Sequence, residues 1–142
     1  MRRIFSLSLL MFTMVIILTS CAKKIAFNQS GVVPGASGTT KIKKDKNQNY
    51  QLDISIRDLA PSKDLMPSKE YYVVWLETEN NGIKNIGQIS SSSSLLSRAR
   101  KASLSTVTPF RPRSIFITAE DDMNIQYPGT YVILKTDQVN LK

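Results

Sequence analysis

Histidine is absent from this chain of 142 residues, and cysteine occurs once, as Cys21. Without histidine, the chain can form no Ser-His or Cys-His catalytic set and no histidine general base, and most zinc sites are excluded. With a single cysteine, it can form no internal disulfide. These absences favour a protein without enzymatic activity, cofactor or metal ion.

Recognisable catalytic motifs are missing as well. The sequence has no Gly-x-Ser-x-Gly motif, no Ser-x-x-Lys motif in a helical context and no glycine-rich phosphate loop. We interpret Ser62-Lys63 and Ser68-Lys69 as chance pairs in a loop; a hydrolase would need serine, lysine and carboxylate groups clustered in a pocket. The one acidic cluster, Glu120-Asp121-Asp122, lacks the pattern of a calcium loop, so we expect a solvated, charged loop there.

The chain also lacks an apolar run long enough to span a bilayer comfortably. Its longest run, Ile4 to Leu18, is interrupted by three hydroxyl residues and follows the basic pair Arg2-Arg3. A short apolar stretch with a basic flank is typical of a secretory signal peptide. The sequence therefore predicts that residues 1–20 form an export signal.

The end of this signal, Leu18-Thr19-Ser20-Cys21, resembles a lipobox, in which a small residue precedes an obligatory cysteine. The resemblance implies cleavage between Ser20 and Cys21, with acyl chains on Cys21 as the membrane contact. The alternative is an ordinary signal or anchor with a chance cysteine. The position of the only cysteine, where the signal ends, favours the lipobox.

The residues after Cys21 bear on where the protein resides. Ala22 is not the aspartate that sorts some lipoproteins to the inner membrane, and Lys23-Lys24 replaces the acidic run of some surface-exported ones. These features predict a protein anchored outside the cytoplasm, at the periplasmic face of an outer membrane in a host with two membranes. Residues 21–38 are rich in turn formers and predict a flexible tether, although part of this segment, around Ile25 to Phe27 or Val32 to Val33, is an alternative edge strand.

Positive charge exceeds negative charge, with 19 basic and 11 acidic residues. We interpret this excess as solubility and general attraction to anionic surfaces, without a nucleic-acid partner. Scattered solvation is the favoured reading of the basic residues in the second half of the chain. Their alternative is an anion-binding patch made of Arg98, Arg100, Lys101, Arg111 and Arg113.

Beyond the tether, residues 39–142 predict one domain made of strands. Tyr50 to Leu59 alternates cleanly between apolar and polar residues, and Asn80-Asn81-Gly82 is a tight-turn signal between two strands. Glu70 to Thr78 is apolar on both faces, which predicts a central strand with Trp75 at the middle of the core. Seven strands are expected in all: 39–44, 50–59, 70–78, 83–89, 102–107, 114–120 and 130–136.

Seven strands separated by turn signals predict an all-β fold, an antiparallel β-sandwich of immunoglobulin-like architecture. We expect residues 90–94 to form a solvated serine-rich loop and residues 95–101 a brief helical turn. The lysines of 41–46 are expected to protect an edge strand from pairing with another chain.

The folded part resembles the extracytoplasmic C-terminal domain of anti-sigma-K-factor-like proteins. The resemblance covers roughly residues 50–136 and is carried by Tyr72-Val73-Val74-Trp75-Leu76, Ile86-Gly87-Gln88, Ile115-Phe116-Ile117-Thr118-Ala119-Glu120 and Pro128-Gly129. It implies an envelope β-sandwich used for sensing or protein contact. The chain departs from those regulators because a signal and a cysteine replace their sigma-binding domain and membrane helix.

These observations support two functional hypotheses. The first is a noncatalytic, membrane-anchored envelope lipoprotein whose β-sandwich binds another protein or senses a signal. The alternative is a lipoprotein that binds a glycan, an anionic lipid or a small ligand.

Overall fold

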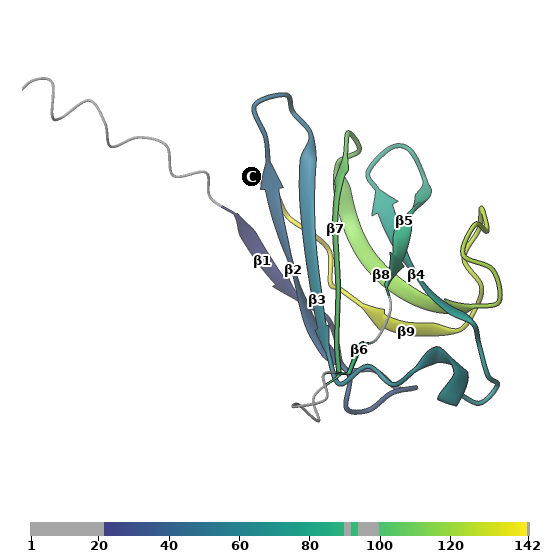
Figure 1. Ribbon diagram of the computed structural model, residues 1–142. Coiled ribbons are helices and arrows are strands. Elements are labelled where there is room, and N and C mark those ends of the chain that lie inside the picture. The colour runs from purple at the N-terminus through teal and green to yellow at the C-terminus, as the bar shows by residue number, and fades with distance from the viewer. Residues whose placement is uncertain (1–21, 90–91, 94–99, 142) are drawn as a thin grey trace, which may run out of the picture.

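The computed structural model describes residues 22–89, 92–93 and 100–141, which form two antiparallel β-sheets packed face to face (Figure 1). The five-stranded sheet has the order β1-β2-β3-β7-β6, with bounds Lys23–Ala26, Ser37–Lys44, Tyr50–Arg57, Arg100–Thr108 and Ser92–Ser93. The four-stranded sheet has the order β5-β4-β8-β9, with bounds Ile83–Ile89, Tyr71–Thr78, Pro112–Glu120 and Val132–Lys135. The predicted all-β sandwich is confirmed.

All seven expected strands are present, and the structure adds β1 and β6. The only helical element in the described part of the chain is a 3₁₀ turn, Ser62–Asp64, in the loop after β3. None of the described segments is a helix with the length and apolar character needed to cross a membrane. Sheet order from β2 onward, β2-β3-β7-β6 facing β5-β4-β8-β9, follows the A-B-E-D and C′-C-F-G order of immunoglobulin-type sandwiches.

The main core lies between the two sheets and is formed by the inward-facing side chains of strands. Leu52, Ile54 and Ile56 of β3 point inward and are buried, as their period-two pattern predicts. Tyr72, Val74 and Leu76 of β4 face them from the other sheet, together with Ile115 and Ile117 of β8. At about 25 cal/mol per Å² of apolar surface, these side chains provide the main driving force for folding.

The prediction of a flexible tether is wrong for residues 22–38. β1 pairs with β2 along its whole length, and Phe27, Val33 and Ala36 are buried in the main core. The Ser30 hydroxyl accepts the backbone N–H of Val33 at 2.9 Å, which fixes the turn between them. The buried residues have no regular spacing, so periodicity could not reveal them, and the alternative edge strand is the one observed.

Because β1 covers one side of β2, the lysines of β2 do not protect a sheet edge as expected. β2 lies between β1 and β3, with Lys24 of β1 opposite Lys41 of β2. β1 itself is the edge on that side of the sheet. The lysines of β2 therefore require another explanation.

Trp75 is fully buried, but it does not lie in the main core. It faces outward from the four-stranded sheet, in a second cluster with Val73 and Phe116, which Tyr71 and Ile125 cover. Its ring stacks on Phe116, with centroids 6.3 Å apart. In antibody domains the corresponding tryptophan packs inward against a disulfide. The likeness to immunoglobulin domains is therefore one of strand order.

The turn between β4 and β5 forms as predicted. Gly82 has a φ of 69°, which favours glycine, and the Thr78 hydroxyl donates to the Gly82 carbonyl at 2.7 Å. The expected helical turn at 95–101 is wrong at its end, because Arg100 and Lys101 begin β7; its other residues lie outside the described residues. Of the serine-rich segment, Ser92–Ser93 form β6 instead of a loop.

Candidate binding groove

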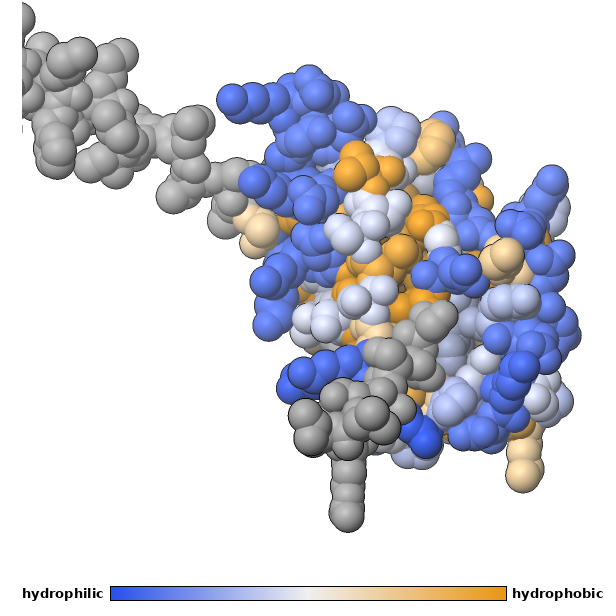
Figure 2. Space-filling view, in the orientation of Figure 1, coloured by the Kyte–Doolittle hydropathy of each residue, from blue (hydrophilic) through white to orange (hydrophobic). Residues whose placement is uncertain are grey.

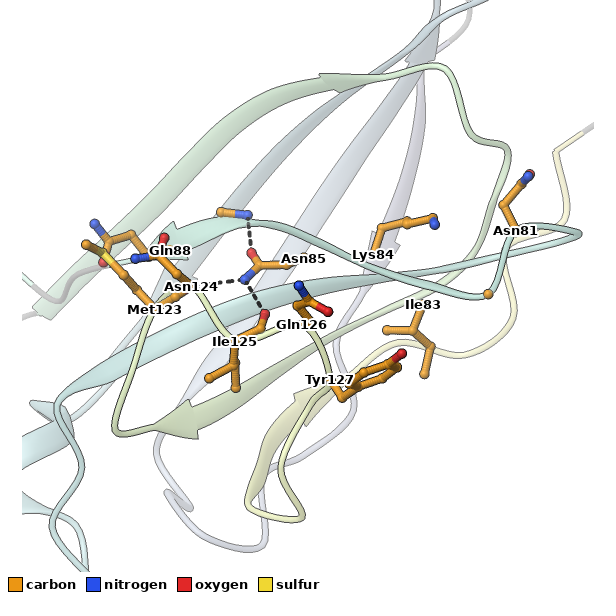
Figure 3. Close-up of a pocket in the computed structure, with 12 residues that line it drawn as sticks. Asn81, Ile83, Lys84, Asn85, Gln88, Met123, Asn124, Ile125, Gln126 and Tyr127 are labelled. Atoms are coloured by element: carbon orange, nitrogen blue, oxygen red, sulfur yellow. Dashed lines mark hydrogen bonds between the residues drawn. The ribbon is translucent and has the colours of Figure 1, made fainter.

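A groove with a volume of about 790 Å³ runs between β5 and the loop that joins β8 to β9 (Figure 3). The turn before β5 and β5 itself form one wall, and residues 123–127 form the other. Its lining consists of Asn81, Gly82, Ile83, Lys84, Asn85, Gly87, Gln88, Met123, Asn124, Ile125, Gln126 and Tyr127. The groove therefore lies on the outer side of the four-stranded sheet, at its β5 edge.

Asn85 joins the two walls of the groove. Its Nδ2 donates to the carbonyl oxygens of Met123 at 2.9 Å and Ile125 at 3.2 Å (Figure 3). Its Oδ1 accepts the backbone N–H of Gly87 at 3.1 Å, where a bulge interrupts the pairing of β5 with β4. A single side chain on β5 thus uses both its donor and its acceptor to hold the loop in place.

The base of the same loop is held by Glu120, the last residue of β8. Its Oε1 accepts the backbone N–H of Gly129 at 2.8 Å, and Glu120 is buried although we expected it to be solvated. Asp121 pairs with Lys69 at 2.7 Å, and this carboxylate raises the pKa of the lysine. Both ends of the loop are therefore tied to the sandwich, so the groove does not depend on a ligand for its shape.

Apolar side chains gather at this groove. Of the six large apolar side chains exposed in the described part of the chain, three line it: Ile83, Met123 and Tyr127. Tyr127 is 81% exposed, and Figure 3 shows its ring beside Ile83. Exposed aromatic and methionine side chains in one place are typical of binding surfaces.

The polar lining is made of neutral amides. Five amide side chains reach the groove: Asn81, Asn85, Gln88, Asn124 and Gln126. No carboxylate lies among the lining residues, and their one charged side chain, Lys84, has its Nζ 5.3 Å from the centre of the Phe110 ring. Amides both donate and accept hydrogen bonds, so this groove suits an uncharged polar ligand with apolar parts, such as an extended peptide or a glycan.

The structure does not bring the predicted basic patch together. Arg98 lies outside the described residues, and Arg100 and Lys101 begin β7, whereas Arg111 and Arg113 follow its far end. A nine-residue strand spans roughly 27 Å, so the two groups lie at opposite ends of the sandwich. The arginines instead meet carboxylates: Arg100 with Asp64 at 3.9 Å, Arg111 with Glu79 at 2.9 Å and Arg113 with Glu77 at 3.8 Å.

The acidic cluster and the two serine–lysine pairs form no joint site in the structure. Glu120, Asp121 and Asp122 have separate partners, the last accepting the Asn124 backbone N–H at 2.9 Å. Nowhere in the described residues do three or more side chains of the metal-binding types gather. The hydroxyls of Ser62 and Ser68 donate to backbone carbonyls at 2.8 and 3.0 Å, which gives both a structural role.

The groove was not predicted from the sequence, although a signal was there. Residues 123–127 alternate apolar and amide side chains, Met-Asn-Ile-Gln-Tyr. In the structure Ile125 covers Trp75, while Tyr127 stays exposed. Ser20 and Cys21 lie outside the described residues, so the lipobox remains a prediction.

Comparisons with protein-family models, with curated proteins and with solved structures found no match for this chain.

Proposed function

We propose that this protein is a membrane-anchored envelope lipoprotein whose noncatalytic β-sandwich binds a segment of another protein in the groove beside β5. The main support is the lining of this groove, which combines three exposed apolar side chains, Ile83, Met123 and Tyr127, with five amide side chains. A hydrogen bond also joins the two walls of the groove. Protein interfaces are enriched in tyrosine and methionine and depleted of carboxylates, as this groove is.

An extended peptide fits this chemistry. β5 is the outer strand of its sheet, so the groove follows a strand edge along which a peptide can run. The amides of Gln88 and Gln126 supply hydrogen bonds for peptide N–H and C=O groups, and Tyr127 and Ile83 supply apolar anchors. Tyrosine is among the residues that most often dominate the binding energy of an interface.

A pair of single substitutions tests the binding site. Tyr127→Ser removes the main apolar anchor, and Val107→Ser removes another exposed apolar side chain, 60% exposed, on the five-stranded sheet. We expect a tagged protein from detergent-solubilised membranes to retain its partner with the Val107 change and to lose it with the Tyr127 change. Equal recovery with both variants would place the binding surface elsewhere.

The lipid anchor is a separate part of the proposal. The basic pair, the apolar run and the only cysteine at the end of that run support it. Two or more acyl chains on Cys21 give stable attachment, whereas one chain gives only marginal attachment. We expect Cys21→Ala to abolish labelling by radioactive palmitate and to leave an unprocessed precursor. Continued labelling would rule the anchor out.

A glycan is the second candidate ligand, and one observation favours it. Neutral amides around an exposed tyrosine ring offer both hydrogen bonds for sugar hydroxyls and a face for a sugar ring. A thermal-shift screen against glycans separates the candidates. A shift that Tyr127→Ser removes and Val107→Ser keeps would favour the glycan, and no shift with any glycan leaves the protein partner as the better account.

The resemblance to anti-sigma-K-factor-like domains agrees with protein contact or sensing, and we retain it as part of this proposal. We likewise propose the periplasmic face of an outer membrane as the location and no nucleic-acid partner. Cell fractionation with Cys21→Ala as the soluble reference tests the location. Recovery of the unmodified protein in the inner-membrane fraction would correct it.

A further inference from the structure

The outer face of the five-stranded sheet carries a concentration of positive charge. Strand register places five basic residues and one carboxylate, Asp53, on this face, which we call the cationic face. The basic residues are Lys24, Lys41, Lys43, Arg57 and Lys101. All five basic residues are exposed. In Figure 2, hydrophilic residues line the flank formed by β1 and β2, at the left of the view.

Like charges lie directly opposite each other on this face. Lys24 of β1 pairs in register with Lys41 of β2, and Arg57 of β3 with Lys101 of β7. Cross-strand pairs of like charge destabilise a sheet, so folding alone does not account for them. Lys24, Lys41 and Arg57 take part in none of the ion pairs found within the described ranges.

The single carboxylate, Asp53, lies in register with Lys41 and offsets one of the five positive charges. Asp53 accepts hydrogen bonds from the Ser105 hydroxyl at 2.6 Å and from the Gln51 amide at 3.3 Å. Between the two basic pairs lies a row of small side chains, Ala26, Thr39, Ser55 and Ser103. The pair Lys24 and Lys41 is in register with Asp53 of β3, and the other pair includes Arg57, four residues further along the same strand. The two basic pairs are therefore roughly 13 Å apart, and the surface between them is formed by short side chains.

The start of β1 places this face close to the predicted anchor. β1 begins at Lys23, two residues after Cys21, which leaves at most about 7 Å of extended chain between them. Because no tether intervenes, a lipid on Cys21 holds the β1 edge of the cationic face near the head groups. This step rests on the anchor of the proposed function, whereas the charge arrangement does not.

We propose that the cationic face lies flat against the anionic phospholipid head groups of the membrane that holds the anchor. Four or more basic residues on one surface, held at a membrane, are typical of binding to anionic lipid. The five basic residues meet phosphates, and the small side chains between them allow close approach. The groove beside β5 belongs to the opposite sheet, so this orientation leaves it facing away from the membrane.

Residues 22–142 without the signal are suited to the test, because every described strand and both apolar clusters lie within them. The probes are vesicles of phosphatidylcholine with and without phosphatidylglycerol, and binding is measured by co-sedimentation. This assay needs no lipid on Cys21, so its outcome is independent of palmitate labelling. We expect binding to the anionic vesicles and its loss at high salt.

Two double variants with equal charge change decide the point. Lys24→Gln with Lys41→Gln removes one basic pair of the cationic face, and Lys63→Gln with Lys135→Gln removes two exposed lysines elsewhere. We expect the first to weaken binding to anionic vesicles roughly tenfold to thirtyfold and the second to weaken it less than about threefold.

Three outcomes would overturn the proposal. Equal losses in both double variants would show attraction by net charge alone, and equal binding of the unmodified chain to neutral and anionic vesicles would show no role for phosphate. Stronger retention on RNA than on anionic vesicles, reversed only by the first double variant, would reassign the face to a different partner. Thermal unfolding of each variant confirms that the fold is retained.

Discussion

Trp75 and Thr118 lie on the neighbouring strands β4 and β8, and the indole Nε1–H of Trp75 donates a hydrogen bond to the Thr118 hydroxyl at 2.7 Å. Both side chains are fully buried on the outer face of the four-stranded sheet. The second apolar cluster therefore has a polar centre whose one indole donor is satisfied. Ile125, which packs on this cluster, also lines the groove, so the cluster supports one wall of the candidate site.

Thr118→Val tests this hydrogen bond. Valine keeps the shape of threonine but leaves the buried indole N–H without an acceptor, which we expect to lower the free energy of unfolding by about 1–3 kcal/mol. Urea unfolding followed by the fluorescence of the only tryptophan measures it. Thr118→Ser keeps the hydroxyl and serves as the control; a valine variant as stable as the unmodified protein would show that this hydrogen bond does not stabilise the fold.

Gly129 lies against Glu120 with no space for a side chain. A Cβ at position 129 would come within 2.7 Å of Glu120 Oε2, whereas a Cβ at Gly31 would meet nothing within 4 Å. We expect Gly129→Ala to lower the free energy of unfolding by about 1–3 kcal/mol and Gly31→Ala to leave it nearly unchanged. Chemical denaturation of the two variants side by side measures the difference, and equal stability would show that Glu120 moves aside without cost.

Asn85→Ala is expected to separate binding from folding. The substitution removes the hydrogen bonds to the Met123 and Ile125 carbonyls and the acceptor of the Gly87 N–H, all at exposed positions, so we expect a loss of stability of only about 1–2 kcal/mol. We expect partner recovery to fall much more, because the loop wall loses its fixed position. Amide hydrogen exchange in residues 121–129 reports the loosened loop. Asn140→Ala, outside the groove, should change neither measurement, and unchanged exchange in the Asn85 variant would contradict the account.

Tyr72 gives the fold a dependence on alkaline pH. Burial raises the pKa of Tyr72 from 10 to about 12, with a smaller contribution from Asp64, and its hydroxyl donates to the Ala60 carbonyl at 2.8 Å. The pKa is higher in the folded state, so the stabilisation is complete below pH 10 and is lost as the pH rises from 10 through about 12.

An alkaline titration of tyrosinate absorbance checks the direction of this shift. We expect one tyrosine to ionise near pH 12 in the folded protein, and this step to be missing in Tyr72→Phe. The free energy of unfolding of the phenylalanine variant should also decline less steeply above pH 10. A step near pH 12 that persists in the phenylalanine variant would contradict its assignment to Tyr72.

Strands with an alternating or a continuous apolar pattern could be predicted from the sequence, whereas β1, which has neither, was only an alternative. β3 alternates strictly and forms as expected, and Asn80-Asn81-Gly82 gave the β4–β5 hairpin because Gly82 adopts a positive φ. β1 has only one partly buried residue, Ile25, so its sequence shows no alternation of apolar and polar side chains. Its place depends on Phe27 entering the core beyond it, which is a long-range contact.

The site was harder to predict than the fold, for two physical reasons. Both faces of β4 are apolar, so the pattern could not show that Trp75 faces outward; the covering Ile125 comes from a distant loop. The basic residues at 98–113 are close in sequence, yet β7 runs between Lys101 and Arg111 and carries them to opposite ends. Closeness along a chain predicts closeness in space only where the chain turns back.

Site-specific photo-crosslinking in intact cells tests the central claim most directly. A photoreactive phenylalanine analogue is placed at Tyr127 in the groove or at Val107 on the other sheet, with Cys21 intact in both. The account predicts a discrete protein adduct from position 127, absent from position 107 and lost when Asn85→Ala is added. Adducts of equal strength at both positions, or none at 127, would contradict a protein partner in this groove.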